Sequence, residues 1–150
     1  MSNGANNSLK AAIGVLICDD NEAMRALLRV VIKLRPTLRV VGEAADGHDS
    51  IREATRLQPD VILLDLAMPR RTGLEVLPEI REKAPDAKII IFSGFSTASV
   101  AEGAIDLGAI HYLMKGADPE AINDAIEEVV AESNPGTLVS ASSRFERPST

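Results

Sequence analysis

The sequence predicts an α/β fold, in which helices cover both faces of a five-stranded parallel sheet. From Ile13 onward, short apolar runs alternate five times with longer amphipathic segments, and this alternation is typical of β-α units. Acidic residues, a serine and a lysine directly follow four of the apolar runs. Polar groups at strand ends suit the carboxyl edge of an open α/β sheet, where ligands bind. Right-handed crossovers then favour a doubly wound three-layer sandwich with strand order 2-1-3-4-5.

The first β-α unit comprises a strand at Ile13–Cys18 and a helix at about Glu22–Arg35. The strand is an unbroken apolar run, as expected for a strand that is buried on both faces. The helix has apolar residues at helical spacing, and Pro36 ends it. These apolar residues are Met24, Leu27, Leu28, Val31 and Leu34.

The second unit comprises a strand at Arg39–Glu43 and a helix at about Gly47–Leu57. Ile51 and Ala54 recur at helical spacing and should face the sheet. The third strand is expected at Val61–Asp65, where four apolar residues precede an aspartate. The strand order 2-1-3-4-5 would place it beside the first strand.

The third helix should span about Gly73–Lys83. Thr72 and Glu75 have the spacing of a capping box, in which each side chain bonds a free amide at the helix start. Pro78 within this stretch predicts a kink or a short helix. The fourth strand is expected at Lys88–Phe92.

The fourth helix should span about Thr97–Leu107, and the fifth strand Ile110–Met114. The last helix is expected at Pro119–Glu132, because Asp118 suits the N-cap and proline suits the first helical position. Its buried stripe should contain Ala121, Ile122, Ala125, Ile126, Val129 and Val130.

These units form one domain at residues 12–132. Residues 1–11 and 133–150 are rich in small and polar residues, which predicts a flexible N-terminal tail and a flexible C-terminal tail or linker stub. The chain has 150 residues, of which 45% are hydrophobic and 25% charged, as is usual for one soluble domain.

Charge and apolar content argue against several classes of function. The net charge is −6 and the basic residues do not cluster, so we expect no direct binding to nucleic acid. No apolar run is long enough for a membrane span, and the first ten residues lack a signal-peptide pattern. We therefore expect a cytoplasmic protein without a membrane partner. Cys18 is the only cysteine, which excludes an internal disulfide.

Three aspartates should meet at one edge of the predicted sheet. Asp19 and Asp20 follow the first strand and Asp65 closes the third, and these strands are neighbours at the switch point of the order 2-1-3-4-5. Adjacent carboxylates repel each other unless a cation lies between them. Magnesium is held by one or two carboxylates, with water and phosphate oxygens as its other ligands. The alternative is that Asp20 or Asn21 merely caps the following helix while Asp19 is solvated.

Two further polar residues end strands at the same edge. Ser93 follows the fourth strand and Lys115 follows the fifth. Neither residue is informative alone, because serines often end strands and most lysines are solvated. Together with the aspartates, however, a hydroxyl and an ammonium suit a phosphoryl group. Asp65 is the candidate to receive it.

The motifs resemble those of response regulator receiver domains, which include the chemotaxis receiver. The run from Asp65 to Pro69, Asp-Leu-Ala-Met-Pro, resembles the acceptor loop of that family. The other matching residues, in order, are Asp19-Asp20 with Arg25, Ser93-Gly94, and Tyr112 with Lys115. The resemblance extends from about Ile13 to Glu132. The run Lys-Gly-Ala-Asp-Pro-Glu, which starts at Lys115, is similar to receivers of nitrate-response-type helix-turn-helix regulators.

This resemblance implies a flavodoxin-like fold and a role in two-component signalling rather than in turnover catalysis. A sensor histidine kinase or a phosphotransfer protein would phosphorylate Asp65. Mg²⁺ would be bound by Asp19, Asp20, Asp65 and the Ala67 carbonyl. Phosphate would be bound by Ser93, Gly94 and Lys115, and the switch residues would be Ser93 and Tyr112. The fourth helix, fifth strand and fifth helix would then change their surface, controlling an output such as transcription and, on phosphorylation, homodimer formation.

Other functions fit the same sheet edge less well. An aspartate-nucleophile phosphatase typically has a second aspartate two residues after the nucleophile, but this chain has Ala67 there. A receiver kept only for protein binding would be expected to lose Asp65 or Lys115, and both are present. A stand-alone receiver that acts through protein contacts or as a phosphate sink is an alternative to the DNA-binding regulator.

Two residues depart from the family pattern: Gly116 replaces a common proline, and Ala67 replaces a common polar side chain. The second departure bears on the lifetime of the phosphoryl group.

Overall fold

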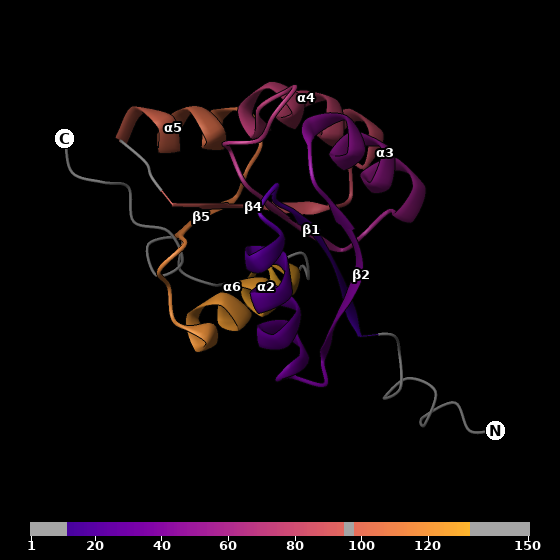
Figure 1. Ribbon diagram of the computed structural model, residues 1–150, viewed down its shortest axis with the longest axis vertical. Coiled ribbons are helices and arrows are strands. Elements are labelled where there is room, and N and C mark those ends of the chain that lie inside the picture. The colour runs from indigo at the N-terminus through magenta and orange to yellow at the C-terminus, as the bar shows by residue number, and fades with distance from the viewer. Residues whose placement is uncertain (1–11, 95–97, 133–150) are drawn as a thin grey trace.

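The computed structural model describes residues 12–94 and 98–132, and its sheet confirms the predicted fold class (Figure 1). All neighbouring strands are parallel, in the order β2-β1-β3-β4-β5. The strands are β1 (Ile13–Cys18), β2 (Leu38–Ala44), β3 (Val61–Leu64), β4 (Lys88–Ser93) and β5 (His111–Met114). The helices are α2 (Glu22–Lys33), α3 (Gly47–Leu57), α4 (Gly73–Lys83), α5 (Ala98–Asp106) and α6 (Pro119–Ala131).

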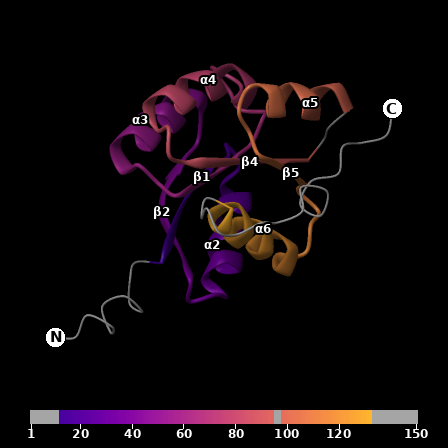
Figure 2. The same cartoon turned by 180° about the vertical axis from the view of Figure 1, so that it is seen from behind.

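The helices form two layers, one on each face of the sheet. Helices α3, α4 and α5 cover one face, and α2 and α6 cover the other (Figures 1 and 2). Side chains alternate along β1, so that Leu16 packs in the core beneath α3 and α4 while Val15 and Ile17 pack in the core beneath α2 and α6. Both cores are therefore closed, as expected for a parallel sheet.

Most element boundaries lie within two residues of the predicted ones. Strand β4 includes Ser93, whereas β3 ends at Leu64, so that Asp65 is the first residue of the following loop. The predicted helix start at Thr97 and both predicted tails lie outside the described residues. Within those residues, no helix combines the length and apolar character that a membrane crossing requires.

The apolar residues that recur at helical spacing along α2 are not all buried. Leu28 and Val31 are buried, but Leu27 is 53% exposed and Leu34, just after the helix, is 64% exposed. Apolar residues occupy more than one face of this helix, and Val30 is also exposed. Periodicity marks an amphipathic helix, but the neighbouring β1, β2 and α6 decide which of its apolar residues are covered.

Helix starts largely follow the predicted capping chemistry. Thr72 and Glu75 form the reciprocal capping box at the start of α4. Helix α4 continues through Pro78 to Lys83. Asp118 occupies the N-cap of α6 and Pro119 its first turn, but the Asp118 side chain makes no capping hydrogen bond. Proline alone therefore pre-organises that helix start.

Candidate functional site

The predicted carboxylates meet at the carboxyl edge of the sheet. One oxygen each from Asp19, Asp20 and Asp65 lies within 4.8 Å of the other two. Asp19 and Asp65 are buried, with 1% and 3% of their surfaces exposed, whereas Asp20 is exposed. The contact follows from topology, because β1 and β3 are neighbours and the Asp65 N–H donates to the Cys18 carbonyl at 2.9 Å.

Lys115 is the counter-ion of the two buried carboxylates. Its Nζ lies 2.8 Å from Asp19 Oδ2 and 3.2 Å from Asp65 Oδ2. The Lys115 N–H also donates to the Ser93 carbonyl at 2.9 Å, which ties the ends of β4 and β5 together. Burial acts to lower the pKa of Lys115, but the two carboxylates outweigh burial and raise that pKa above its usual value. Lys115 is therefore held as an ammonium.

Asp65 lies in a tightly packed loop. Its Oδ1 accepts the Ala67 N–H at 3.2 Å, and the Leu66 carbonyl accepts the Gly73 N–H at 3.0 Å. Burial raises the pKa of the Asp65 carboxyl, although the Ala67 N–H opposes this shift. The charge of Asp19 raises this pKa further, and Lys115 lowers it. An additional cation would relieve this repulsion.

The phosphate-binding residues that we predicted line a common pocket of about 570 Å³. Ser93, Gly94 and Lys115 contribute to its wall on the β4–β5 side, and Asp20, Asp65 and Ala67 on the β1–β3 side. Tyr112 does not line this pocket. It is partly buried and packs against the core on the α3–α4–α5 face.

Comparisons with known proteins agree with this geometry. The model of the response regulator receiver domain family matches residues 15–127. This chain belongs to that family. The uncharacterized transcriptional regulatory protein YxjL of Bacillus subtilis is 41% identical over 117 residues, and the nitrate/nitrite response regulator NarL of Escherichia coli is 38% identical over the same length. Each match covers 78% of this chain but only 54% of the relative, so the chain spans about half the length of these regulators.

Solved structures support the same assignment. A LuxR-family two-component response regulator from Aurantimonas superimposes with a TM-score of 0.77 and 32% identity, over 81% of this chain and 87% of that chain. Response regulators are signalling proteins, and their receiver domains are phosphorylated by histidine kinases. The predicted family and fold are therefore confirmed.

The receiver's acidic pocket also has the chemistry of a magnesium site. Receiver domains generally bind Mg²⁺ at such a pocket, and carboxylate and carbonyl oxygens are the ligands that this ion prefers. Here three carboxylates lie together, and Lys115 pairs with the two buried ones, Asp19 and Asp65. Asp19 Oδ2 is buried and accepts no hydrogen bond of good geometry within the described residues, even though it lies close to Lys115 Nζ. The residues present therefore fit a divalent cation.

Some pocket residues escaped the prediction from sequence. Leu66, Leu74 and Val100 form apolar parts of the wall, and no chemical motif marks them. Thr72 and Asn21 also line the pocket while they cap α4 and α2. Both residues are of types that often cap helices. Helices that follow strands in a parallel sheet begin at its carboxyl edge, so their capping residues lie near this pocket.

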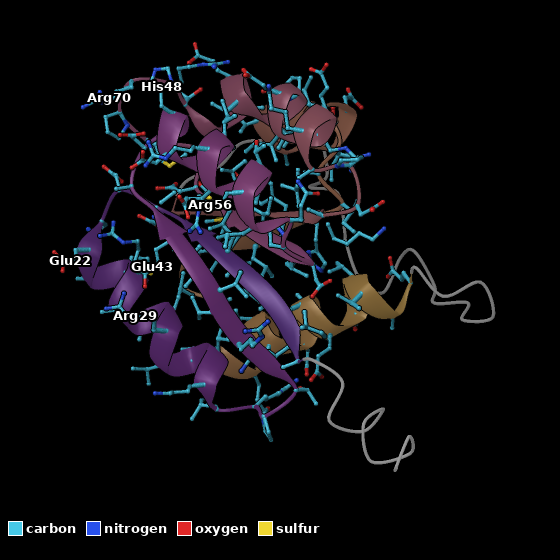
Figure 3. The ribbon with its side chains drawn as sticks, turned by 90° about the vertical axis from the view of Figure 1, so that its right-hand side faces the viewer. Glu22, Arg29, Glu43, His48, Arg56 and Arg70 are labelled. Atoms are coloured by element: carbon cyan, nitrogen blue, oxygen red, sulfur yellow. The ribbon has the colours of Figure 1, made fainter. Side chains whose placement is uncertain are left out.

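The arginines and histidines near the acceptor loop have ordinary partners or are solvated. Arg70 lies close to Asp46, and Arg71 pairs with Glu79 at 2.9 Å. His48 is exposed beside Arg70 at the start of α3 (Figure 3). His111 is buried, and its Nδ1 accepts the Tyr112 N–H.

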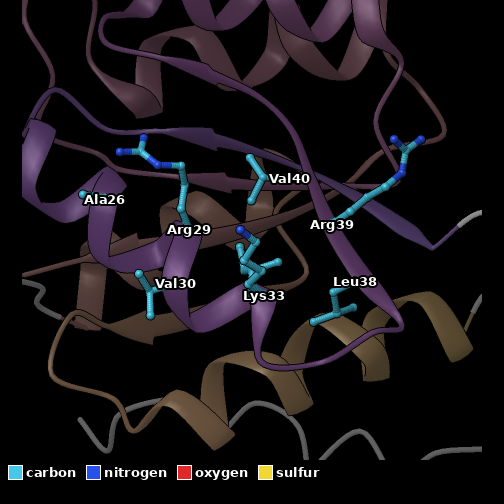
Figure 4. Close-up of a pocket in the computed structure, with 8 residues that line it drawn as sticks. Ala26, Arg29, Val30, Lys33, Leu38, Arg39 and Val40 are labelled. Atoms are coloured by element: carbon cyan, nitrogen blue, oxygen red, sulfur yellow. The ribbon is translucent and has the colours of Figure 1, made fainter.

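A second hollow lies between α2 and the edge strand β2, and it shares no lining residue with the acidic pocket. Its volume is about 500 Å³. Arg29 and Lys33 line it from α2, and Arg39 lines it from β2 (Figure 4). Leu38 and Val40 supply part of its apolar floor.

Proposed function

We propose that this receiver accepts a phosphoryl group on Asp65 from a sensor histidine kinase or a phosphotransfer protein. The observation that carries this proposal is the environment of Asp65, whose buried carboxylate lies beside Asp19 and 3.2 Å from Lys115 Nζ. A carboxylate nucleophile needs nearby positive charge to receive an anionic group. We assign a signalling role because Ala67 lies two residues after Asp65, where an aspartate-nucleophile phosphatase typically has a second aspartate.

In the proposed transfer, a carboxylate oxygen of Asp65 forms a bond to phosphorus as the phosphorus–nitrogen bond of the donor's phosphohistidine breaks. The electron pair of the broken bond remains on the imidazole nitrogen, which takes up a proton. Lys115 stays protonated throughout and neutralises charge on the phosphoryl oxygens. Catalysis of this kind depends on positioning and electrostatics rather than on covalent assistance.

We assign the metal ligands to Asp19, Asp20, Asp65 and the Ala67 carbonyl. When bound, Mg²⁺ would supply positive charge to the oxygens of the transferring group. The bound ion would also offset the repulsion between the buried, like-charged carboxylates of Asp19 and Asp65. Ala67 has no side chain that could position an attacking water, so its contribution is confined to its backbone.

The switch that we propose uses Ser93 and Tyr112. Ser93 is buried at the end of β4, where its carbonyl already accepts the Lys115 N–H. Its hydroxyl would bond the phosphoryl group together with the Gly94 N–H, and Tyr112 would turn toward the space vacated by the Ser93 loop. The surface formed by α5, β5 and α6 would then change. Leu107 and Met114 expose apolar surface there, which suits a protein partner.

The output that we propose is transcriptional control by a DNA-binding domain outside this chain. Support comes from relatives such as YxjL, which is named as a transcriptional regulatory protein, and from the length of these relatives, which is about twice that of the matched region. The receiver itself would bind no nucleic acid, since its net charge is −6. Phosphorylation would favour a homodimer, as expected from the resemblance. A stand-alone receiver that acts through protein contacts or as a phosphate sink is the alternative.

Intact-mass spectrometry after incubation with a small acyl phosphate and Mg²⁺ tests the acceptor. The wild-type protein should gain one phosphoryl group, and Asp65→Asn should gain none. Asp86→Asn is a matched control, because Asp86 is an exposed aspartate in the turn before β4, at the opposite edge of the sheet. Labelling of Asp65→Asn at the wild-type stoichiometry would refute the assignment of Asp65, and labelling without Mg²⁺ would refute the role of the metal.

A further inference from the structure

Arg25 connects the candidate metal site to the edge strand. It lies in the second turn of α2, and its Nη1 donates to the Asp19 carbonyl at 2.8 Å. Its Nε donates to Glu43 Oε1 at 3.0 Å. Both side chains are largely shielded from solvent. One guanidinium therefore joins the end of β1 to the end of β2 through two hydrogen bonds in different directions.

The Arg25 bond acts on the peptide that joins the two metal-site aspartates. The Asp19 carbonyl belongs to the peptide unit between Asp19 and Asp20. Its orientation therefore sets the position of the backbone nitrogen of the exposed Asp20. The preceding peptide is fixed as well, because the Asp19 N–H donates to the Ala44 carbonyl at 2.9 Å. Asp19 Oδ1 accepts the Asn21 N–H at 2.9 Å. The backbone around Asp19 is thus held on both sides, and Arg25 is the side chain that holds the Asp20 side.

A β-bulge directs Glu43 toward Arg25. Leu38 and Val40 pack in the core beneath α2, so regular alternation would direct Glu43 to the opposite face. Strand β2 has one extra residue, Val41, between the pairs Val15–Val40 and Leu16–Gly42. The extra residue reverses the alternation, so that Ala44 packs beneath α3 and Glu43 faces α2. Bulges often re-aim a side chain next to a functional site.

We infer that Arg25 and Glu43 are positioning residues for magnesium binding, and that they act by orienting the Asp19–Asp20 peptide. This inference rests on the proposed function of the acidic pocket. Removal of a group that hydrogen-bonds to a metal ligand and orients it typically lowers metal affinity by about 10–100-fold. The direction of the effect is diagnostic. Loss of a positive charge near a cation site would by itself strengthen Mg²⁺ binding, whereas loss of positioning weakens it.

Arg29 is a natural control for Arg25. It also pairs with Glu43, through Oε2, but it makes no bond to the Asp19 backbone among the described contacts. Its side chain lies beside Glu43 at the edge of the molecule and lines the α2–β2 hollow (Figures 3 and 4). Arg25 and Arg29 thus share a charge and a partner, and differ in their contact with Asp19.

The experiment is an MgCl₂ titration followed by backbone amide shifts, for the wild type and for Arg25→Ala, Arg25→Lys, Glu43→Ala, Arg29→Ala and Arg29→Lys. We expect Mg²⁺ affinity to fall about tenfold or more in Arg25→Ala. Arg25→Lys should also bind more weakly than the wild type, since one ammonium does not reproduce the fork that joins the two acceptors. Glu43→Ala should show a smaller loss. The Arg29 variants should stay within about twofold of the wild type, because only contact with Asp19 matters in this scheme.

A double variant tests whether Arg25 and Glu43 act through one path. If both orient the same peptide, Arg25→Ala/Glu43→Ala should bind Mg²⁺ about as weakly as Arg25→Ala alone, because coupled effects are not additive. Urea unfolding of each variant identifies those that are folded before titration, and Arg25→Lys retains the aliphatic stem if Arg25→Ala does not fold.

The outcomes separate the inference from the proposed function. Unchanged or tighter Mg²⁺ binding in folded Arg25 variants would overturn the positioning role, as would an equal loss in the Arg29 variants. A wild-type protein that shows no Mg²⁺-dependent amide shifts around Asp19 and Asp65 would instead overturn the metal site itself, and the positioning inference with it.

Discussion

Gly73 provides a quantitative test of the packing beneath the acceptor loop. A Cβ at this position would lie 2.3 Å from the Asp65 carbonyl oxygen and 2.9 Å from Leu66 Cα. Both neighbours are backbone atoms, which cannot move away by a change of rotamer. The φ angle of Gly73 is not positive, since the only positive-φ glycine of the described residues is Gly108. Gly73→Ala therefore introduces a steric conflict with the acceptor residue rather than a strained backbone.

The expected cost is about 1–3 kcal/mol in the free energy of unfolding, which is the usual range for an extra methyl group in a closely packed site. Gly103→Ala is the matched control. Gly103 lies inside α5, and a Cβ there would meet no atom within 4 Å. Alanine in a helix interior is more stable than glycine by roughly 0.5–1 kcal/mol, so this variant should be more stable than the wild type.

Urea unfolding followed by circular dichroism measures both variants. The midpoint should fall for Gly73→Ala and rise for Gly103→Ala, with similar slopes. Because the conflict involves the Asp65 carbonyl, phosphorylation of Gly73→Ala by a small acyl phosphate should also be slower than that of Gly103→Ala. Wild-type stability in Gly73→Ala would refute the inferred contact. A stability loss with fully retained phosphorylation would refute its connection to the acceptor.

Two pH-dependent predictions follow from buried groups. Burial raises the pKa of the Cys18 thiol from 9.0 to about 12, so the folded protein keeps this proton longer than the unfolded chain, and the stability it contributes is lost as the pH rises above about 9. Cys18→Ala should therefore lose less stability than the wild type between about pH 8.5 and 10.5 in urea unfolding, by at most about 1.4 kcal/mol per pH unit; parallel curves would contradict a buried thiol. Lys115→Met removes the counter-ion of Asp19 and Asp65. The pKa of Asp65 is already raised in the wild type. A raised carboxyl pKa means that the folded state binds more protons than the unfolded state. Without Mg²⁺, the stability of Lys115→Met relative to the wild type should therefore improve as the pH is lowered from about 7.5 to about 5, and a pH-independent difference would rule out this account.

The fold was predictable because its signals are local. Five apolar runs alternate with amphipathic segments, and some boundaries have a local chemical cause, such as the capping pair Thr72 and Glu75. Periodicity was less informative where apolar residues surround a helix. Leu27 and Leu34 belong to the same helical pattern as the buried Leu28 and Val31, yet they are exposed. Which apolar residues of α2 are covered depends on neighbouring elements that the helix sequence does not encode.

The residues at the sheet edge and the meeting of their three aspartates could be predicted from the sequence, whereas the individual ion pairs and the apolar wall of the pocket could not. Parallel strands bring their carboxyl ends to one edge, and five polar residues end a strand or lie within two residues after one: Asp19, Asp20, Asp65, Ser93 and Lys115. The apolar wall residues Leu74 and Val100 carry no such mark, since many leucines and valines in the chain have similar local surroundings.

The sequence by itself determined the five β-α units, the identity of the charged groups at the sheet edge and the capped start of α4, because these depend on residues that are close along the chain. The tertiary structure decided that Lys115 faces Asp19 and Asp65, and that Arg25 reaches both Glu43 and the Asp19 carbonyl. Those contacts depend on strand order and on the extra residue in β2. They join residues that are far apart in sequence. An unpaired charge is costly in a buried, low-dielectric site, and only the folded chain brings each of these charges to its partner.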